Sequence, residues 1–266
     1  MKILIVSGFL GAGKTTFIKR LARNVDQRFA ILENEYGAAG IDGARLGQNR
    51  QGTQKNVWEM TEQCICCIGK KDFAASVLTI ANVVDPEYLI VEPTGVGSLA
   101  RIIENLRQIE YERIQLLSPV TIVDVYSYRR YMAEYPELYQ DQIRSADTII
   151  VSKTEACQAE EKQRIQKFLQ EINPQAKIIT DDASTMTRED YQSLLLGGRY
   201  EKEVQDTQSG EKMPETFSFE NIRMEAPETL WCFLEQIIRG AFGNIIRAKG
   251  QFAAGGQLLQ FDIADH

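Results

Sequence analysis

The chain has 266 residues, with 30 Lys and Arg against 37 Asp and Glu, which gives a formal net charge of −7 and a pI near 5.0. This acidic balance, without a block of basic residues, argues against nucleic acid as a partner. A hydrophobic fraction of 44% suffices for one large domain with a small addition, and no apolar stretch approaches the ~20 residues of a membrane helix. We expect a cytoplasmic protein that binds neither nucleic acid nor membrane.

The first predicted element is an apolar strand at residues 2–7, which leads directly into a G-x-x-x-x-G-K-[ST] phosphate-binding loop. Its glycines allow backbone N–H groups to surround a phosphate, and the helical spacing after the loop adds the positive end of a helix dipole. Lys14 is expected on the β- and γ-phosphates and the Thr15 hydroxyl on Mg²⁺. The predicted nucleotide-binding residues of this loop are Gly8, Gly11, Ala12, Gly13, Lys14, Thr15 and Thr16. The alternative, a glycine-rich turn that matches by chance, is disfavoured by this strand-to-helix setting.

Further apolar runs predict strands that alternate with amphipathic segments. Strands are expected at residues 29–33, 57–60, 88–92, 120–124, 148–152 and 177–180, and helices at 73–84 and 160–172. Such alternation is typical of βαβ units, so we predict an α/β fold with a doubly wound, mainly parallel sheet of the P-loop type. Ligands bind beyond the carboxyl ends of such strands, where Glu33, Glu92, Asp124 and Lys153 fall.

An acidic, glycine-rich stretch follows the second predicted strand. Glu33-Asn-Glu35 ends that strand, and residues 36–43 contain three glycines. A loop of this kind can become ordered around Mg²⁺ and the γ-phosphate, with the Glu35 carboxylate available to the metal or the attacking water. A solvated acidic turn is the alternative reading.

Three of the five cysteines lie within four positions, at Cys64, Cys66 and Cys67. An odd number of cysteines and this crowding argue against a secreted disulfide framework. Thiolates from one loop can bind Zn²⁺ or another soft metal ion, and the fourth ligand would be Glu62, water or a partner, since the single histidine is His266. A redox-active thiol cluster and simple buried cysteines are the alternatives. Cys157 and Cys232 are interpreted as structural.

The predicted strand at residues 88–92 ends in an acid and is followed by Pro-Thr-Gly, residues 93–95. Glu92 lies where an NTPase holds Mg²⁺ or its water, and Gly95 can offer its N–H to the γ-phosphate and move when that phosphate leaves. With Lys14 and Glu35, the residues Glu92, Thr94 and Gly95 form the predicted catalytic set. An ordinary proline-containing turn is the alternative.

The final part of the chain differs in composition from the rest. Residues 196–214 are polar and read as a linker or exposed loop. Beyond them, strands are expected at 216–220, 244–252 and 257–263, with a helix at 227–239. We therefore predict a P-loop domain at residues 1–195, the linker at 196–214, and a small α+β domain at 215–266.

These motifs together resemble the CobW-like P-loop GTPases, the cobalamin-synthesis-protein family. The resemblance rests on the phosphate loop, Glu33-Asn-Glu35, Cys64-x-Cys66-Cys67 and Glu92-Pro-Thr-Gly95 in this order, and on Arg247-Ala-Lys249-Gly250 near the end of the chain. It implies a GTP-dependent metallochaperone that delivers zinc, or in some members cobalt, to a client metalloprotein.

The resemblance also implies where guanine is read, and here the chain departs from the family. The family's Asn-Lys-x-Asp corresponds to Ser152-Lys153-Thr154-Glu155, so the carboxylate that accepts guanine N–H groups is one methylene longer and the Asn amide is missing. Gln63 replaces the glycine usual before the first cysteine, and the histidine-rich tract of some members is absent. Ser152, Lys153 and Glu155 are the predicted base-binding residues.

The leading hypothesis is a slow GTPase that binds a transition metal at its Cys-x-Cys-Cys loop and transfers it on hydrolysis. Two alternatives belong to other classes. One is a P-loop kinase or ligase for a small metabolite, with structural cysteines. The other is a non-catalytic metal sensor or store that uses nucleotide only for stability.

Overall fold

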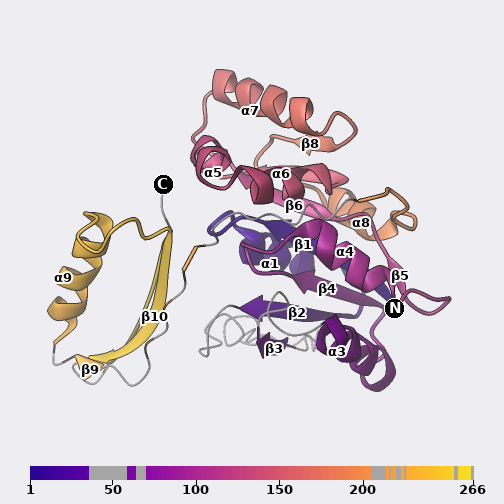
Figure 1. The fold of residues 1–266 in the computed structure, drawn as a ribbon, viewed down its shortest axis with the longest axis horizontal. Helices are drawn as coiled ribbons and strands as arrows, with labels where there is room; N and C mark the ends of the chain where they lie inside the picture. Colours follow the sequence, from indigo (N-terminus) through magenta and orange to yellow (C-terminus); the bar gives the residue numbers. More distant parts are fainter. Residues whose placement is uncertain are drawn as a thin grey trace.

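The chain forms a large α/β unit with a smaller unit beside it, as seen in the computed structural model in Figure 1. The structure describes residues 1–35, 59–63, 70–204, 214–215, 217, 219, 223–224, 226–254 and 257–264. No helix among them is long and apolar enough to cross a membrane.

The large unit is built on a parallel sheet of eight strands within the described ranges, in the order β3-β2-β4-β1-β6-β7-β8, with β5 pairing β1. The strands are β1 (Lys2–Gly8), β2 (Phe29–Glu35), β3 (Glu59–Gln63), β4 (Tyr88–Glu92), β5 (Gln115–Leu116), β6 (Val120–Asp124), β7 (Thr148–Ser152) and β8 (Lys177–Ile179). Because the strands are parallel, their carboxyl ends lie at one edge of the sheet, as the sequence predicted.

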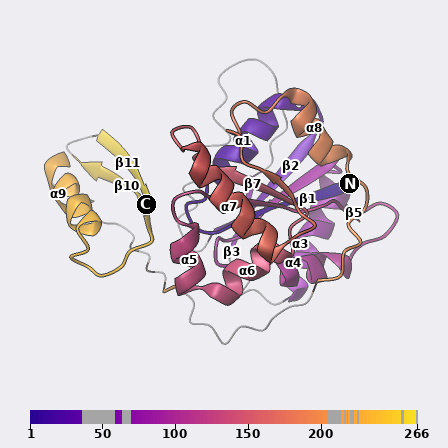
Figure 2. The ribbon, with the colours of Figure 1, turned by 90° about the horizontal axis from the view of Figure 1, so that it is seen from above.

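Helices cover both faces of this sheet (Figure 2). They are α1 (Lys14–Asn24), α3 (Lys70–Val83), α4 (Leu99–Arg107), α5 (Tyr128–Glu134), α6 (Pro136–Arg144), α7 (Ala159–Ile172) and α8 (Arg188–Leu196). Alternate residues of β1 serve opposite faces: Leu4 packs with side chains of α1 and α8, whereas Ile3 packs with those of α3 and α4. A strand buried on both faces needs a continuous apolar run, which explains why the central strands were visible in the sequence.

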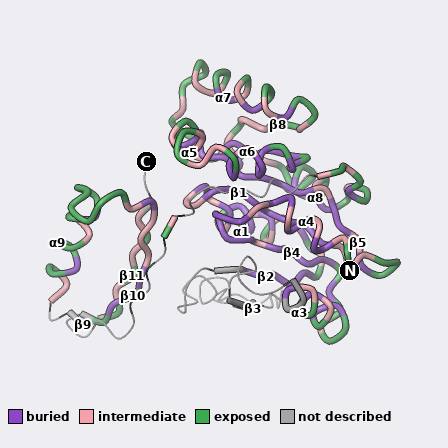
Figure 3. Tube along the Cα trace, in the orientation of Figure 1, coloured by how far each residue is buried: buried purple, intermediate pink, exposed green. Residues whose placement is uncertain are grey.

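The small unit consists of β9 (Arg223–Met224), α9 (Pro227–Ile238), β10 (Arg247–Ala254) and β11 (Gln257–Ala264). β10 and β11 pair antiparallel from Arg247 opposite Ala264 to Ala254 opposite Gln257. Much of α9 is exposed in Figure 3, including Trp231. The small unit is connected to the large unit by, among other contacts, a hydrogen bond of 2.5 Å from the Arg130 guanidinium of α5 to Asn244 Oδ1.

The expected fold class is confirmed, and the strands at residues 88–92, 120–124 and 148–152 have the predicted bounds. The strand expected at 216–220 is wrong: the described residues Phe217 and Phe219 lie outside any strand, and the short strand beside β10 is β9. Alternating phenylalanines suggested one buried face, but both rings are largely exposed. The division at 195 and 214 stays a prediction; Tyr200 is buried against the large unit, with its hydroxyl donating to Ser145 O at 2.8 Å.

Candidate nucleotide site

The phosphate loop occupies the turn between β1 and α1, in a backbone conformation that depends on glycine. Gly8, Gly11 and Gly13 have φ of 143°, 72° and 97°. A Cβ on Gly8 would lie 2.3 Å from the Ile122 carbonyl oxygen on the neighbouring strand β6. Both the dihedrals and this close contact therefore exclude larger side chains.

Lys14 is the first residue of α1, and its side chain is turned back onto the loop. Only 6% of the residue is exposed, and Nζ donates to the carbonyl oxygens of Gly8 at 2.9 Å and Phe9 at 3.1 Å. A buried ammonium requires such partners. The lysine thus places a positive charge inside the loop, close to where the pattern predicts phosphates.

Aromatic packing supports the outer side of the same loop. The Phe9 ring lies 4.2 Å from that of Tyr131 on α5 and 5.9 Å from that of Tyr139 on α6, measured between ring centroids. Burial raises the pKa of Tyr131 to about 12 and that of Tyr139 well above its ordinary value, so these phenols stay neutral. The loop is backed by a rigid apolar layer.

The Thr15 hydroxyl and the Glu92 carboxylate meet at the carboxyl edge of the sheet. Thr15 Oγ1 donates to Glu92 Oε1 at 2.9 Å. The adjacent strand places buried Glu33 opposite Glu92 in register. A hydroxyl and a carboxylate this close are hard oxygen donors of the kind that Mg²⁺ prefers, so these residues fit the metal that the sequence predicted.

The turn after β4 presses directly on the phosphate loop. A Cβ on Gly95 would lie 2.5 Å from the Leu10 backbone nitrogen. Thr94 is buried, and its carbonyl accepts from the Gly97 N–H at 3.0 Å. The structure therefore brings the predicted residues Glu92, Thr94 and Gly95 against the loop that carries Lys14.

On the other side of the loop, the end of β7 and the residues directly after it include the predicted base-binding residues. Ser152 Oγ donates to the Ala12 carbonyl at 2.6 Å, which ties the end of β7 to the phosphate loop. Lys153, with a left-handed φ of 60°, has Nζ 2.7 Å from Asp124 Oδ2. Asp124 also accepts from the Tyr126 N–H at 2.9 Å through Oδ1, so this buried carboxylate fixes both the lysine and the chain after β6.

A pocket of about 540 Å³, including its open mouth, lies between these residues and α1. Its lining includes Ala12, Gly13, Thr16, Phe17, Arg20, Ser152, Lys153, Glu155, Asp182 and Ala183. Asp182 and Ala183 were not among the predicted site residues, although they follow β8 and the rule that ligands bind beyond strand ends would have found them. Hydrogen bonds from the Ser184 hydroxyl and N–H hold the pKa of Asp182 below its ordinary value.

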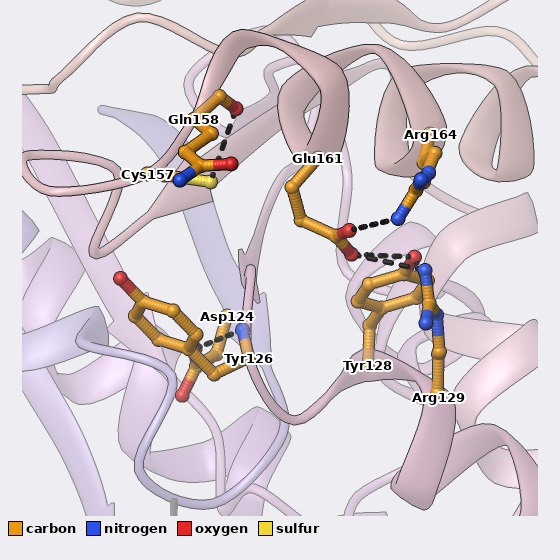
Figure 4. A network of polar contacts seen from close by, with 8 residues as sticks. All are labelled: Asp124, Tyr126, Tyr128, Arg129, Cys157, Gln158, Glu161 and Arg164. Carbon is orange, nitrogen blue, oxygen red and sulfur yellow. Dashed lines mark hydrogen bonds and ion pairs between the residues drawn. The ribbon is translucent and has the colours of Figure 1, made fainter.

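A network of polar contacts connects the helices α5 and α7 (Figure 4). Glu161 of α7 is 3.0 Å from the Arg129 guanidinium and 3.2 Å from that of Arg164, and it accepts from the Tyr128 hydroxyl at 3.2 Å. Figure 4 shows Asp124, Tyr126 and Cys157 close by. The network joins α5, which follows β6, to α7, which follows β7.

Cys64, Cys66 and Cys67, the predicted transition-metal ligands, lie outside the described residues, as does the whole glycine-rich loop at residues 36–43. Glu35 is at the end of β2, and its side chain is not described. Among the described residues no cluster of three or more His, Cys, Asp or Glu side chains could hold a metal ion. Cys157 and Cys232 are free thiols.

Comparison with known proteins adds independent information. The sequence profile of the "CobW/HypB/UreG, nucleotide-binding domain" family matches residues 2–180. Zinc chaperone YeiR of Escherichia coli K12 is 30% identical over 178 residues, 66% of this chain and 53% of YeiR. Zinc chaperone CobW of Pseudomonas aeruginosa is 27% identical over 62% of this chain and 52% of that protein. The chain thus spans about half the length of these curated relatives.

Two solved structures share the fold. The Zn(II)-bound YjiA GTPase from E. coli is 18% identical and superimposes with a TM-score of 0.53. The superposition covers 100% of this chain and 89% of the YjiA chain. HypB from Helicobacter pylori in complex with nickel is 16% identical and superimposes with a TM-score of 0.50. The superposition covers 72% of this chain and 82% of the HypB chain. At these identities the likeness concerns the fold alone.

Proposed function

This chain belongs to the CobW/HypB/UreG family of P-loop GTPases, and on that premise we propose that it binds and hydrolyses GTP with Mg²⁺ in order to deliver a transition metal to a client metalloprotein. Zinc is the first candidate for the delivered metal and cobalt the second. The cytoplasm, where thiols stay reduced, is the proposed compartment.

The observation that carries the proposal is the 2.9 Å hydrogen bond between Thr15 and Glu92 beside the phosphate loop. It joins the start of α1 to the end of β4, the two places from which a P-loop enzyme holds Mg²⁺. When bound, Mg²⁺ would neutralise charge that develops on the phosphates, and Thr15 and Glu92 would hold it directly or through water.

The other residues of the phosphate side act on the nucleotide. Lys14 exchanges its hydrogen bonds with the Gly8 and Phe9 carbonyls for bonds to the β- and γ-phosphates, which keeps the buried ammonium paired. Gly95 offers its backbone N–H to the γ-phosphate. Glu35 orients the attacking water or contributes to the metal. In the hydrolysis step the water oxygen bonds to the γ-phosphorus, the bond from that phosphorus to the β–γ bridging oxygen breaks, and GDP, inorganic phosphate and a proton are released.

The pocket between Ser152 and Asp182 is the proposed guanine site. The Glu155 carboxylate accepts guanine N–H groups, which adenine does not offer in the same arrangement. The Lys153 stem packs on the base while its ammonium stays paired with Asp124. Ser152 holds the base side against the phosphate loop through Ala12.

Cys64, Cys66 and Cys67 are proposed to bind the delivered metal. Strand register supports a link between this loop and the nucleotide, because Gln63, directly before Cys64, pairs with Glu35 at the end of β2. A rearrangement of the chain at Glu35 around the γ-phosphate would therefore be separated from the three thiolates by only a few residues. By linkage, if GTP raises the affinity for metal, the metal raises the affinity for GTP by the same factor.

A chelator competition tests this proposal. The Zn²⁺ affinity of the wild type is measured with a non-hydrolysable GTP analogue and with GDP, and we expect the two affinities to differ by about tenfold or more. A double variant, Cys66→Ser with Cys67→Ser, should abolish Zn²⁺ binding, whereas Cys157→Ser with Cys232→Ser should not change it. Equal affinities in both nucleotide states, or full binding by the first double variant, would contradict metal delivery.

A further inference from the structure

A buried glutamine on α6 holds the turn that carries Gly95. Gln142 is 1% exposed, and its side-chain Nε2 donates to the carbonyl oxygens of Gly95 and Gly97, each at 3.1 Å. Both partners are carbonyls, which only accept, so the amide nitrogen must face them. One side chain therefore fixes two peptide groups of the turn, from a helix 45 to 47 residues further along the chain.

The residue before it holds the next part of the same segment. Asp141 Oδ2 accepts from the backbone N–H groups of Leu99 at 2.6 Å and Ala100 at 3.4 Å, at the start of α4. A carboxylate at a helix N-terminus pairs with free N–H groups and favours the helix dipole. Together the two side chains fasten the chain from Gly95 to Ala100 onto α6.

The helix that provides these side chains is itself anchored to the sheet. The Thr121 hydroxyl of β6 donates to the Gln142 carbonyl at 2.9 Å. On its opposite side the turn meets the phosphate loop, because a Cβ on Gly95 would lie 2.5 Å from the Leu10 nitrogen. The turn is thus held between a fixed helix and the loop that is proposed to bind the phosphates.

The oxygen of the Gln142 amide, unpaired within the described residues, indicates that this side chain does more than fill space. Gln142 Oε1 is buried and makes no hydrogen bond with the part of the chain that the structure describes. A buried acceptor left unpaired is unfavourable, and an apolar side chain at this place would avoid it. The amide is retained for its nitrogen, whose only described partners are the two carbonyls of the turn.

We infer that Gln142 is a positioning residue for GTP hydrolysis: it holds the carbonyls of Gly95 and Gly97, which fixes the peptide groups after these residues and thereby the turn from which the Gly95 N–H is presented to the γ-phosphate. This inference rests on the proposed function. Because GDP has no γ-phosphate, the loss of Gln142 should weaken binding of a GTP analogue and slow turnover, while GDP binding stays nearly constant.

The test compares Gln142→Met with Gln140→Met. Gln140 lies two residues earlier on the same helix, and its described side-chain partner is the Met132 sulfur at 3.8 Å, away from the turn. Three quantities are measured for both variants and the wild type: backbone hydrogen exchange of residues 94–100 without nucleotide, the Kd values of a GTP analogue and of GDP, and kcat with KM. We expect Gln142→Met to exchange faster by about tenfold, from two lost hydrogen bonds, with a lower kcat and an unchanged GDP affinity.

A second variant keeps the result clear if Gln142→Met does not fold. Gln142→Asn keeps the amide but is one methylene shorter, so its nitrogen is withdrawn from the two carbonyls and it should show the same pattern. Unchanged exchange in the turn, or equal losses of analogue and GDP affinity, would overturn the inference. A wild type that does not hydrolyse GTP would refute the proposed function, whereas the exchange comparison tests Gln142 without nucleotide.

Discussion

The two sides of the candidate nucleotide site are built differently. On the phosphate side, glycines contact the neighbouring backbone at distances that exclude a methyl group, and the polar side chains of Lys14 and Glu33 are buried. On the base side, Glu155 is exposed, and Ser152 and Lys153 are only partly buried. The difference indicates that the phosphate side has one permitted structure, while the base side has room for substitution. The chain's departures from the family pattern at Ser152 and Glu155 fall on the permissive side.

The largest effect is expected from Lys14→Ala. It removes the charge that is proposed to pair with two phosphates, and charge-assisted hydrogen bonds are worth about 1.5–3 kcal/mol each. We expect kcat/KM for GTP to fall by about a thousandfold. Lys19→Ala, further along α1, is the control and should stay close to wild type. Comparable activity of both variants would refute the asymmetry between the two sides.

A smaller but still severe loss is expected from Gly95→Ala. The new methyl would meet the Leu10 backbone nitrogen at 2.5 Å, so the turn must move away from the phosphate loop. Loss of one N–H donor at a reacting centre typically costs about a hundredfold in kcat. Gly198→Ala provides the control, since a Cβ there has nothing within 4 Å. Steady-state kinetics that show equal kcat for both alanine variants would place Gly95 outside the site.

On the base side, Glu155→Gln should change selectivity more than rate. It replaces an acceptor of guanine N–H groups with an amide at an exposed position, so we expect the preference for GTP over ATP to fall by about tenfold, the lower range for such contacts. Competition binding with both nucleotides measures this ratio. Glu160→Gln, an exposed acid on α7, serves as control. An unchanged ratio would show that another group, such as the chain at Asp182, reads the base.

The smallest effect concerns the pKa of Asp182. Hydrogen bonds from Ser184 lower this pKa below the ordinary 3.8 in the folded state, so the folded form binds fewer protons and the bonds stabilise it above pH 3.8. Ser184→Ala should reduce the free energy of unfolding at pH 7 by about 0.5 kcal/mol or less, given the exposure of the pair. The difference should vanish as the pH falls through the lowered pKa. Denaturant melts at pH 7 and pH 3 test this, and Ser184→Thr, which keeps the hydroxyl, should restore wild-type stability.

Much of the fold was predictable because its strongest signals are local. The strand at residues 88–92 is buried on both faces, so its apolar run was visible without a partner. The helices α4, α5, α6 and α8 were missed, since each has nine residues or fewer and gives few periodic positions. At residues 216–220 the alternation was local too, but a strand needs a neighbour, and Phe217 and Phe219 are exposed.

The candidate site divides in the same way. The phosphate loop is specified by residues adjacent in the chain, because glycine conformations and a following helix are enough to define an anion site. Gln142 was not assigned from the sequence, since it belongs to no local pattern with the turn that it holds. Asp182 was also missed, although it follows the end of β8, where ligands bind in such folds.

The sequence by itself determined the phosphate loop, the parallel sheet and the acids at the strand ends, because each depends on periodicity or on backbone preferences over a few residues. Only the tertiary structure decided which of those acids meets Thr15, that Asp124 pairs with Lys153, and that α6 holds the Gly95 turn. These contacts join residues from 29 to 77 positions apart, and the order of strands in the sheet, which no local pattern encodes, brings them together.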